Sequence, residues 1–373
     1  MARLRLKEVR RVLQSVLAIL VFTACGPEVN SPLKKPTGSS ESADAWNAPT
    51  GNAVSGATLF DGWQDLREVA APVTVNGGWT DSVTVMPDGK RLFFGYTRLD
   101  SGQFFDSSGA VQNPSGPSRT GMTGDAFKIF QADLTTSGWQ VSFHPVNGNP
   151  AVHEAAASVN AAGDLMVFSR FDVNGVGTLY YSSLSGGVWS AASVLPTTPA
   201  VNTPNPACTN DNGFIVGTLS GGLTLYFESS RDDLAGTTCR ADGKNRLYFT
   251  NYTTATGFTA PQLVPGLDGG LPNEDDTQIS LTPDKQTVFF TRAHSTAYGV
   301  FTADWNGTTF TNVRQIISPN FVAPFTSKLA MVGEANLATT SSGKILYMMC
   351  GIASSEAGGH APATKVCRMR KPN

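Results

Sequence analysis

Carboxylates at regular positions are the residues of this sequence most capable of chemistry. Asp81, Glu154, Asp276 and Glu334 each lie six or seven residues before a turn, and Asp211 lies near the corresponding place in a fifth segment. Glycoside hydrolysis requires two carboxyl groups on either side of a sugar bond, one protonated and one ionised. One hypothesis is therefore an acidic funnel that receives a sugar, a cation or a basic peptide.

Arginines occupy a second regular position, after the apolar segment that follows the turn. Four segments carry Ser-Arg or Thr-Arg there, at Arg98, Arg170, Arg231 and Arg292. In an antiparallel hairpin the start of one strand lies opposite the end of the next. Glu154 is therefore expected beside Arg170, and Asp276 beside Arg292. This favours the second hypothesis, in which the acids and arginines are structural ion pairs inherited with a repeat.

The elements that must position these residues are short strands. Five turn regions are each followed by an apolar run: MPDGKRLFF, NAAGDLMVF, LSGGLTLYF, LTPDKQTVFF and TSSGKILYM. Each predicts a hairpin. Third strands are expected at 127–132, 178–182, 246–250, 298–303 and 364–369. Fourth strands are marked by the aromatic residues Trp63, Trp139, Trp189, Phe258 and Phe310.

Four-stranded units in series predict an all-β fold, a five-bladed β-propeller with four antiparallel strands per blade. The first outer strand, near Trp63, precedes the first hairpin, and the last hairpin has no outer strand after it. The N-terminal strand is therefore expected to complete the last blade, which leaves no open sheet edge.

The turn sequences resemble the Ser-Pro-Asp-Gly repeats of TolB-like propellers. The segments that carry the resemblance are MPDGKRLFF, LTPDKQTVFF, LYFESSR and VNTPNPAC, and it extends from about Leu59 to the C-terminus. Two turns depart from it, because Ala161-Ala162 and Gly221-Gly222 replace Pro-Asp. Such repeats imply a fold and leave the function open, because binding, scaffolding and catalytic proteins all contain them.

The functional hypothesis is a non-catalytic binding or scaffolding propeller whose partner is an envelope protein or a glycan. Its binding face would carry the long loops 100–124, 231–243 and 351–362. The candidate residues on that face are Asp81, His153, Glu154, Arg170, Arg231, Asp276, Arg292 and Glu334. The alternative is a glycoside hydrolase or polysaccharide lyase that uses Asp81, Glu154, Asp276 or Glu334. Five-bladed arabinanase-like and levanase-like enzymes place a carboxylate triad around the channel, but the sequence hallmarks expected around those acids are absent.

Aromatic residues on the same face allow two interpretations. Trp79, Tyr96, Phe104 and Phe105 could form a stacking platform for sugars, or they could form a small core beneath a loop.

The N-terminal residues predict the cellular localisation of the protein. Residues 1–24 have a basic start and an apolar run of 11 residues, as in a signal peptide. Thr23-Ala24-Cys25 resembles a lipobox, so Cys25 is the predicted lipidation site, and Gly26 after it favours the outer membrane. Residues 25–57 read as a flexible tether and 58–373 as the propeller. Membrane attachment through the lipid alone is expected.

The remaining cysteines and the composition complete the expectations. Four cysteines in an exported chain predict two disulfides, Cys208–Cys239 and Cys350–Cys367. A net charge of −2 argues against nucleic-acid binding. No cofactor or metal site is predicted, although the carboxylates of Asp211-Asn212-Gly213 and Asp232-Asp233 have the chemistry of Ca²⁺ ligands, without a full ligand loop. A monomer is expected.

Overall fold

The structure, a computed structural model, describes residues 44–104, 114–172, 175–267, 275–293, 298–320, 328–353 and 363–373. The predicted signal peptide, Cys25 and most of the predicted tether lie outside the described residues. Within the described residues no helix is long and apolar enough to cross a membrane. The helical elements there are a 3-10 turn, η1 (Ala45–Asn47), and one turn of helix, α2 (Ser101–Phe104).

Three sheets of five strands each contain an antiparallel run in chain order, as the hairpins predicted. The first is β8 (His153–Val159), β9 (Leu165–Phe171), β10 (Gly177–Ser185), β11 (Val188–Trp189) and β12 (Ser193–Val194). The second is β13 (Asn210–Thr218), β14 (Gly222–Ser229), β15 (Arg246–Thr253), β16 (Gly257–Phe258) and β17 (Gln262–Leu263). The third is β18 (Asp275–Leu281), β19 (Thr287–Ala293), β20 (Tyr298–Trp305), β21 (Phe310–Pro319) and, from the N-terminal region, β2 (Ala57–Leu59).

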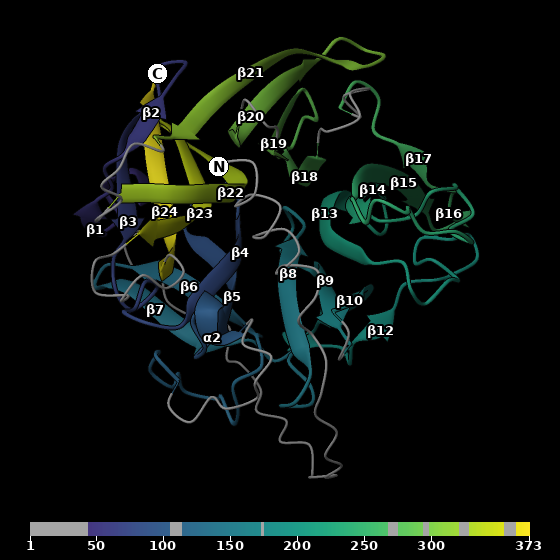
Figure 1. Cartoon of the computed structure of the whole chain (residues 1–373), viewed down its shortest axis with the longest axis horizontal. Coiled ribbons are helices and arrows are strands. Elements are labelled where there is room, and N and C mark those ends of the chain that lie inside the picture. Colours follow the sequence, from purple (N-terminus) through teal and green to yellow (C-terminus); the bar gives the residue numbers. More distant parts are fainter. Residues whose placement is uncertain are drawn as a thin grey trace.

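The fourth sheet has nine strands and consists of two runs joined by a single parallel bridge, Thr364 to Trp79. One run is β4 (Trp79–Val85), β5 (Arg91–Thr97), β6 (Lys128–Thr135) and β7 (Gly138–Phe143). The other is β22 (Lys328–Thr340), β23 (Gly343–Ala353), β24 (Ala363–Pro372), β3 (Gln64–Val69) and β1 (Thr50–Ala53). Figure 1 shows the runs following one another around a centre, with β4, β8, β13, β18 and β22 innermost.

The strand near Trp63 pairs with the C-terminal strand, as the sequence predicted. β3 lies antiparallel to β24, with Glu68 opposite Cys367 and Arg67 opposite Arg368. Figure 1 shows the purple N-terminal strands beside the yellow C-terminal ones. The Lys365 ammonium reinforces the pairing, because it contacts the buried carboxylate of Glu68 at 2.8 Å.

The predicted tether is too long at its C-terminal end. It includes residues 45–57, but Ala45 and Ala48 are buried in the core, and β1 pairs with β3. The guanidinium of Arg368 donates hydrogen bonds to the carbonyl oxygens of Ala45 and Trp46. These contacts were missed because the segment is rich in Pro, Gly and Asn and has no apolar period.

The cysteines confirm one predicted disulfide and correct the other. Cys208 and Cys239 are bonded, with their Cα atoms 5.3 Å apart. Cys350 and Cys367 are buried free thiols. In the register of β23 and β24, Cys350 lies opposite Lys365 and Cys367 opposite Met348, so the two cysteines are diagonal neighbours. Diagonal Cα atoms are about 7–8 Å apart, beyond the usual reach of a disulfide.

Peptide mapping is expected to reproduce this difference. After alkylation of the denatured, unreduced protein, Cys208 should be recovered linked to Cys239, whereas Cys350 and Cys367 should both carry the alkylating label. The native protein should label at neither thiol, because both side chains are fully buried. A Cys350–Cys367 linked peptide would restore the original pairing.

Candidate functional site

The centre of the molecule is shaped by one residue of left-handed backbone on each innermost strand. Each lies in a bulge where the pairing with the next strand shifts. The five residues, with φ between 48° and 57°, are Ser82, Ala156, Asn212, Gln278 and Glu334. All five line one narrow cavity of about 30 Å³, which has room for about two water molecules.

The bulges show that the sequence-predicted acids belong to three different positions. Glu334 is itself a left-handed residue. Asp81 and Asp211 each precede one, and Glu154 and Asp276 lie one residue earlier still. Because a bulge interrupts the alternation of faces, Asp81, Asp211 and Glu334 reach the centre, whereas Glu154 and Asp276 pair with arginines, so the predicted acids do not form one ring. The count from the turn went wrong because β4, β8 and β18 have 7 residues, whereas β13 has 9 and β22 has 13.

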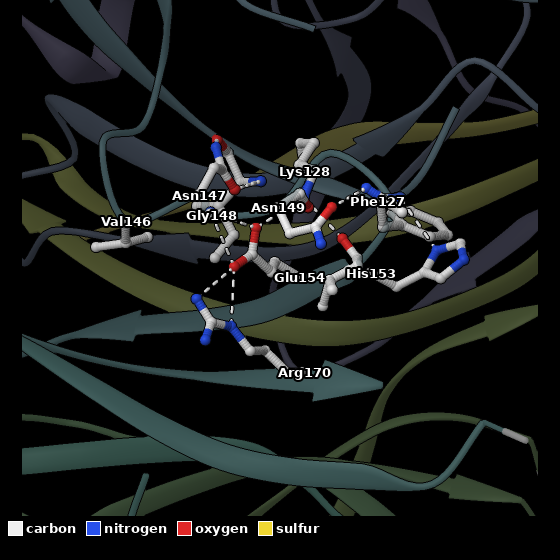
Figure 2. Close-up of polar contacts among 12 residues, drawn as sticks. Phe127, Lys128, Val146, Asn147, Gly148, Asn149, His153, Glu154 and Arg170 are labelled. Atoms are coloured by element: carbon white, nitrogen blue, oxygen red, sulfur yellow. Dashed lines mark hydrogen bonds and ion pairs between the residues drawn. The ribbon is translucent and has the colours of Figure 1, made fainter. Parts of the chain in front are cut away.

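Glu154 lies at the centre of a saturated ion-pair network (Figure 2). Its buried carboxylate accepts a hydrogen bond from Lys128 Nζ at 2.8 Å and from Arg170 Nε at 2.9 Å. The backbone amide of Gly148 donates to both carboxylate oxygens, at 3.1 and 3.0 Å. Lys128 Nζ also donates to the carbonyl oxygens of Asn149 and Val152, which secures that loop. Glu154 therefore has the arginine partner that the hairpin register predicted.

The carboxylate of Asp276 is likewise held in an ion pair with an arginine. Arg292 donates from Nε and Nη2 to the two carboxylate oxygens, both at 2.7 Å. The guanidinium lies over the rings of Phe290 and Phe301. This bidentate pair confirms the second predicted ion pair.

A different set of acids, which we call the axial acids, meets at the centre: Asp81, Asp211, Glu228 and Glu334. Among the described residues, no Lys or Arg lies within ion-pair distance of any of them. Glu334 accepts hydrogen bonds from the backbone amide and the hydroxyl of Ser82, and its carboxyl group lies close enough to that of Asp81 for the two charges to interact. These contacts join β22 to β4.

Glu228 joins the run that contains β14 to the run that begins with β18. Its Oε1 accepts from the backbone amide of Gln278 at 2.5 Å and from Asn212 Nδ2 at 2.7 Å. Its Oε2 accepts from Asn245 Nδ2 at 3.1 Å. Sequence reasoning missed Glu228. Among the described residues it is the only acid on the second strands of the five hairpins, and the register places it opposite Asp211, beside the bulge in β13.

Burial favours protonation of the axial acids. It raises the pKa of Glu228 to about 7, and the neighbouring charge of Asp211 adds to this effect. Burial also raises the pKa of Asp211 to about 6. The pKa of Asp81 is raised by burial. The pKa of Glu334 is raised well above its usual range, by burial and then by the charge of Asp81. The centre can therefore hold protons near neutral pH.

Two other predicted binding-face residues, His153 and Arg231, have structural contacts. His153 Nδ1 accepts a hydrogen bond from the backbone amide of Phe127 at 3.1 Å, and burial lowers the pKa of His153 to about 4. Arg231 is fully buried and donates to the carbonyl oxygens of Ala200 and Val201. Arg98, the first arginine of the regular series, lies 3.2 Å from the carboxylate of Asp125.

The aromatic residues form a small core. The rings of Trp79, Phe104 and Phe127 meet edge to face at centroid distances of 5.2–5.4 Å, and Trp79 and Phe127 are buried. Tyr96 lies in a different apolar cluster, and its hydroxyl donates to the carbonyl oxygen of Pro117. Phe105 lies outside the described residues. The small-core interpretation describes these residues better than a sugar platform.

The segments considered for Ca²⁺ do not assemble into a ligand set. Asp211 lies at the centre, whereas both carboxylate oxygens of Asp233 accept hydrogen bonds from Thr237 and Thr238. Across the described part of the chain, no group of three or more His, Cys, Asp or Glu side chains is arranged to hold a metal ion.

Comparisons with known proteins identify the fold and no family. No protein-family model and no curated protein matches the sequence. A solved glycoside hydrolase is similar in structure, with a TM-score of 0.50 and 8% sequence identity, over 87% of this chain and 92% of the other. A thermostable family-43 glycoside hydrolase matches with a TM-score of 0.47 and 10% identity, over 80% and 91% of the two chains. TolB from Acinetobacter baumannii matches with a TM-score of 0.38 and 13% identity, over 79% of this chain and 54% of its own.

These features define the class of protein. The innermost strands surround a common centre, each starts an antiparallel run, and the solved glycoside hydrolase with a TM-score of 0.50 is a β-propeller. The chain is an all-β protein with the fold of a β-propeller.

Proposed function

We propose that the protein is a non-catalytic binding module of the cell envelope, whose long-loop face engages a protein or glycan partner. One observation supports it above the others: Glu154 and Asp276, which an enzyme would need as free acids, are both saturated by ion pairs. The central cavity, which Glu334 lines, has room for water rather than for a sugar ring. The long loops of the proposed binding face, such as the one closed by Cys208–Cys239, are then the part of the molecule that would contact a partner.

Within this proposal the propeller has five blades. The two runs of the nine-stranded sheet would be the first and last blades, and β3 would supply the outer strand of the last. The single bridge between the runs supports counting them separately. The monomeric state and the absence of a cofactor belong to the same proposal, as does a propeller domain that includes residues 45–57.

The second candidate is a glycan hydrolase or lyase at the axial acids. A carboxyl group with a raised pKa beside a second carboxyl group is what a glycosidase requires, and Glu228 beside Asp211 has that property. Against it, the side chain of Glu228 is only 3% exposed. Substrate would have to open the centre of the molecule before it could reach the acid.

A panel of purified glycans and envelope polymers, scored separately for binding and for turnover, tests the proposal. We expect saturable binding to a partner and no turnover, both in wild type and in Glu228→Gln. Turnover that disappears in Glu228→Gln or Glu334→Gln, while the circular dichroism spectrum is preserved, would establish the enzyme instead.

Lipidation at Cys25 is the proposed mode of attachment to the outer membrane. Cells that express the full chain are expected to incorporate a clickable palmitate analogue into the wild-type protein and not into Cys25→Ser. Cys25→Ser should also move from the membrane fraction to the soluble extracytoplasmic fraction. Labelling of Cys25→Ser at the wild-type level would reject acylation at this residue.

A further inference from the structure

One loop on the proposed binding face is held rigid and presents an apolar tip. It comprises residues 231–240, between β14 and β15, and we call it the Leu234 loop. Leu234 at its tip is 53% exposed, and Ala235 beside it is also exposed. The disulfide Cys208–Cys239 ties this loop to residues 202–209, which we call the Pro204 loop. The exposed residues of the Pro204 loop are apolar: Pro204, Pro206 and Ala207.

The base of the Leu234 loop is fixed by hydrogen bonds within the loop and to neighbouring residues. Asp233 accepts four hydrogen bonds, from the backbone amides and hydroxyls of Thr237 and Thr238. The guanidinium of Arg231 is buried and donates to two backbone carbonyls and to Asn210. Gly236 has a φ of +69°, and a Cβ added there would come within 2.8 Å of Thr203. The two loops are thus packed against each other.

The contacts that fix the Leu234 loop suggest a binding role, because a rigid loop binds at a lower entropic cost than a flexible one. A loop that is ordered before association loses little conformational entropy when a partner arrives. Isolated exposed leucines are ordinary on protein surfaces. Here the leucine stands at the tip of a loop fixed by a disulfide and a buried arginine, and its neighbours across the disulfide are exposed prolines. The side chains that contribute most to binding fill well-packed pockets that exclude water, and leucine is less common among them than Trp, Tyr or Arg. The rigid loop is what distinguishes this leucine.

We propose that the apolar tip formed by Leu234, Ala235, Pro204 and Pro206 inserts into an apolar pocket of a protein partner. This rests on the proposed binding function and narrows its partner from a protein or glycan to a protein. Glycan recognition depends on placed hydrogen-bonding groups, and the side chains at this tip are aliphatic. Asp232, whose side chain is 61% exposed, adjoins the tip; Arg240 lies 3.9 Å from it and pairs more closely with Asp242. We expect a basic group at the rim of the partner's pocket to complement this exposed carboxylate.

The test places a benzophenone amino acid at position 234 of the purified full chain and irradiates it with the cell envelope of its host. We expect a protein adduct that unlabelled wild type suppresses by competition. Leu234→Asp should require a roughly thirtyfold higher concentration for half suppression, the factor that corresponds to about 2 kcal/mol. Val188→Asp is the matched control, because Val188 is 59% exposed on the outer strand β11, and it should compete as well as wild type.

Two further measurements make the test decisive. Competition by the double variant Cys208→Ser/Cys239→Ser should be weaker than by wild type, because the loops are no longer tied; its unfolding transition shows that it is folded. Equal competition by Leu234→Asp and wild type, a glycan or lipid adduct, or no adduct at all would each overturn the apolar-tip proposal. A second probe at exposed Thr120, in the loop between β5 and β6, separates the two claims. If only the Thr120 probe gives an adduct that wild type suppresses, the apolar-tip proposal is rejected and the proposed binding function is retained. Glycan turnover without an adduct from either probe rejects both the binding function and the apolar-tip proposal.

Discussion

Glu154→Gln is expected to lower the free energy of unfolding by roughly 3–5 kcal/mol. The substitution removes the negative charge that balances Lys128 and Arg170, and Lys128 is 4% exposed, so its ammonium would remain buried with only carbonyl partners. The loop at Asn149 should loosen too, because Gly148 loses its ionised acceptor. Urea denaturation followed by tryptophan fluorescence measures the change.

Two variants calibrate this expectation. Asp304→Asn removes an ion pair with Arg314 in which both side chains are 40% exposed, and it should cost at most about 1 kcal/mol. Lys128→Met combined with Glu154→Gln should recover part of the loss, because it removes the buried charge that lacks a partner. If Glu154→Gln is no more harmful than Asp304→Asn, the network does not hold the loop.

Glu228→Gln is expected to make the protein less sensitive to rising pH. The pKa of Glu228 is about 7 in the folded protein, above its ordinary value of 4.5. The folded state therefore binds more protons than the unfolded state between these values, so this contribution to stability is full below pH 4.5 and is lost as pH rises through 7. Over pH 5 to 8 the wild type should lose on the order of 2–3 kcal/mol that the variant keeps.

The variant can keep its hydrogen bonds. The Gln carbonyl oxygen accepts from Gln278 and Asn212 as Glu228 does. Asn245 Oδ1 has no hydrogen-bond partner among the described residues, and a rotated Asn245 amide would accept from the new Gln amide. His144 and His153, whose pKa values are lowered to about 3 and 4 by burial, oppose the trend below pH 6.5 but do so equally in both proteins. Parallel stability curves for the two proteins from pH 5 to 8 would show that Glu228 is ionised throughout.

Local patterns were sufficient to predict the strands and two of the ion pairs. Alternating apolar residues between Pro-Asp or Gly turns specify hairpins, and antiparallel geometry then places Glu154 opposite Arg170 and Asp276 opposite Arg292. The pairing of β3 with β24 followed from counting strands. The core contact of Ala45 did not follow, because a buried alanine in a Pro- and Gly-rich segment has no distinguishing pattern.

The axial acids could not be predicted from spacing alone. Their positions depend on a bulge, which moves one side chain to the other face, and on hairpin lengths that differ between β18 and β22. Glu228 becomes recognisable only when the second strands are aligned by the aromatic residue before it, Phe227. The disulfide proposed for Cys350 failed for a similar reason, since sequence distance did not reveal a diagonal placement.

The pairing of β3 with β24 determines when the chain can finish folding. Glu68 and its partner Lys365 are 297 residues apart, so synthesis, which starts at the N-terminus, delivers β3 long before β24. Until the last strand, of 10 residues, has emerged, β3 has no neighbour on one side and can pair with another chain. A chain that stops before Ala363 is therefore expected to be prone to aggregation.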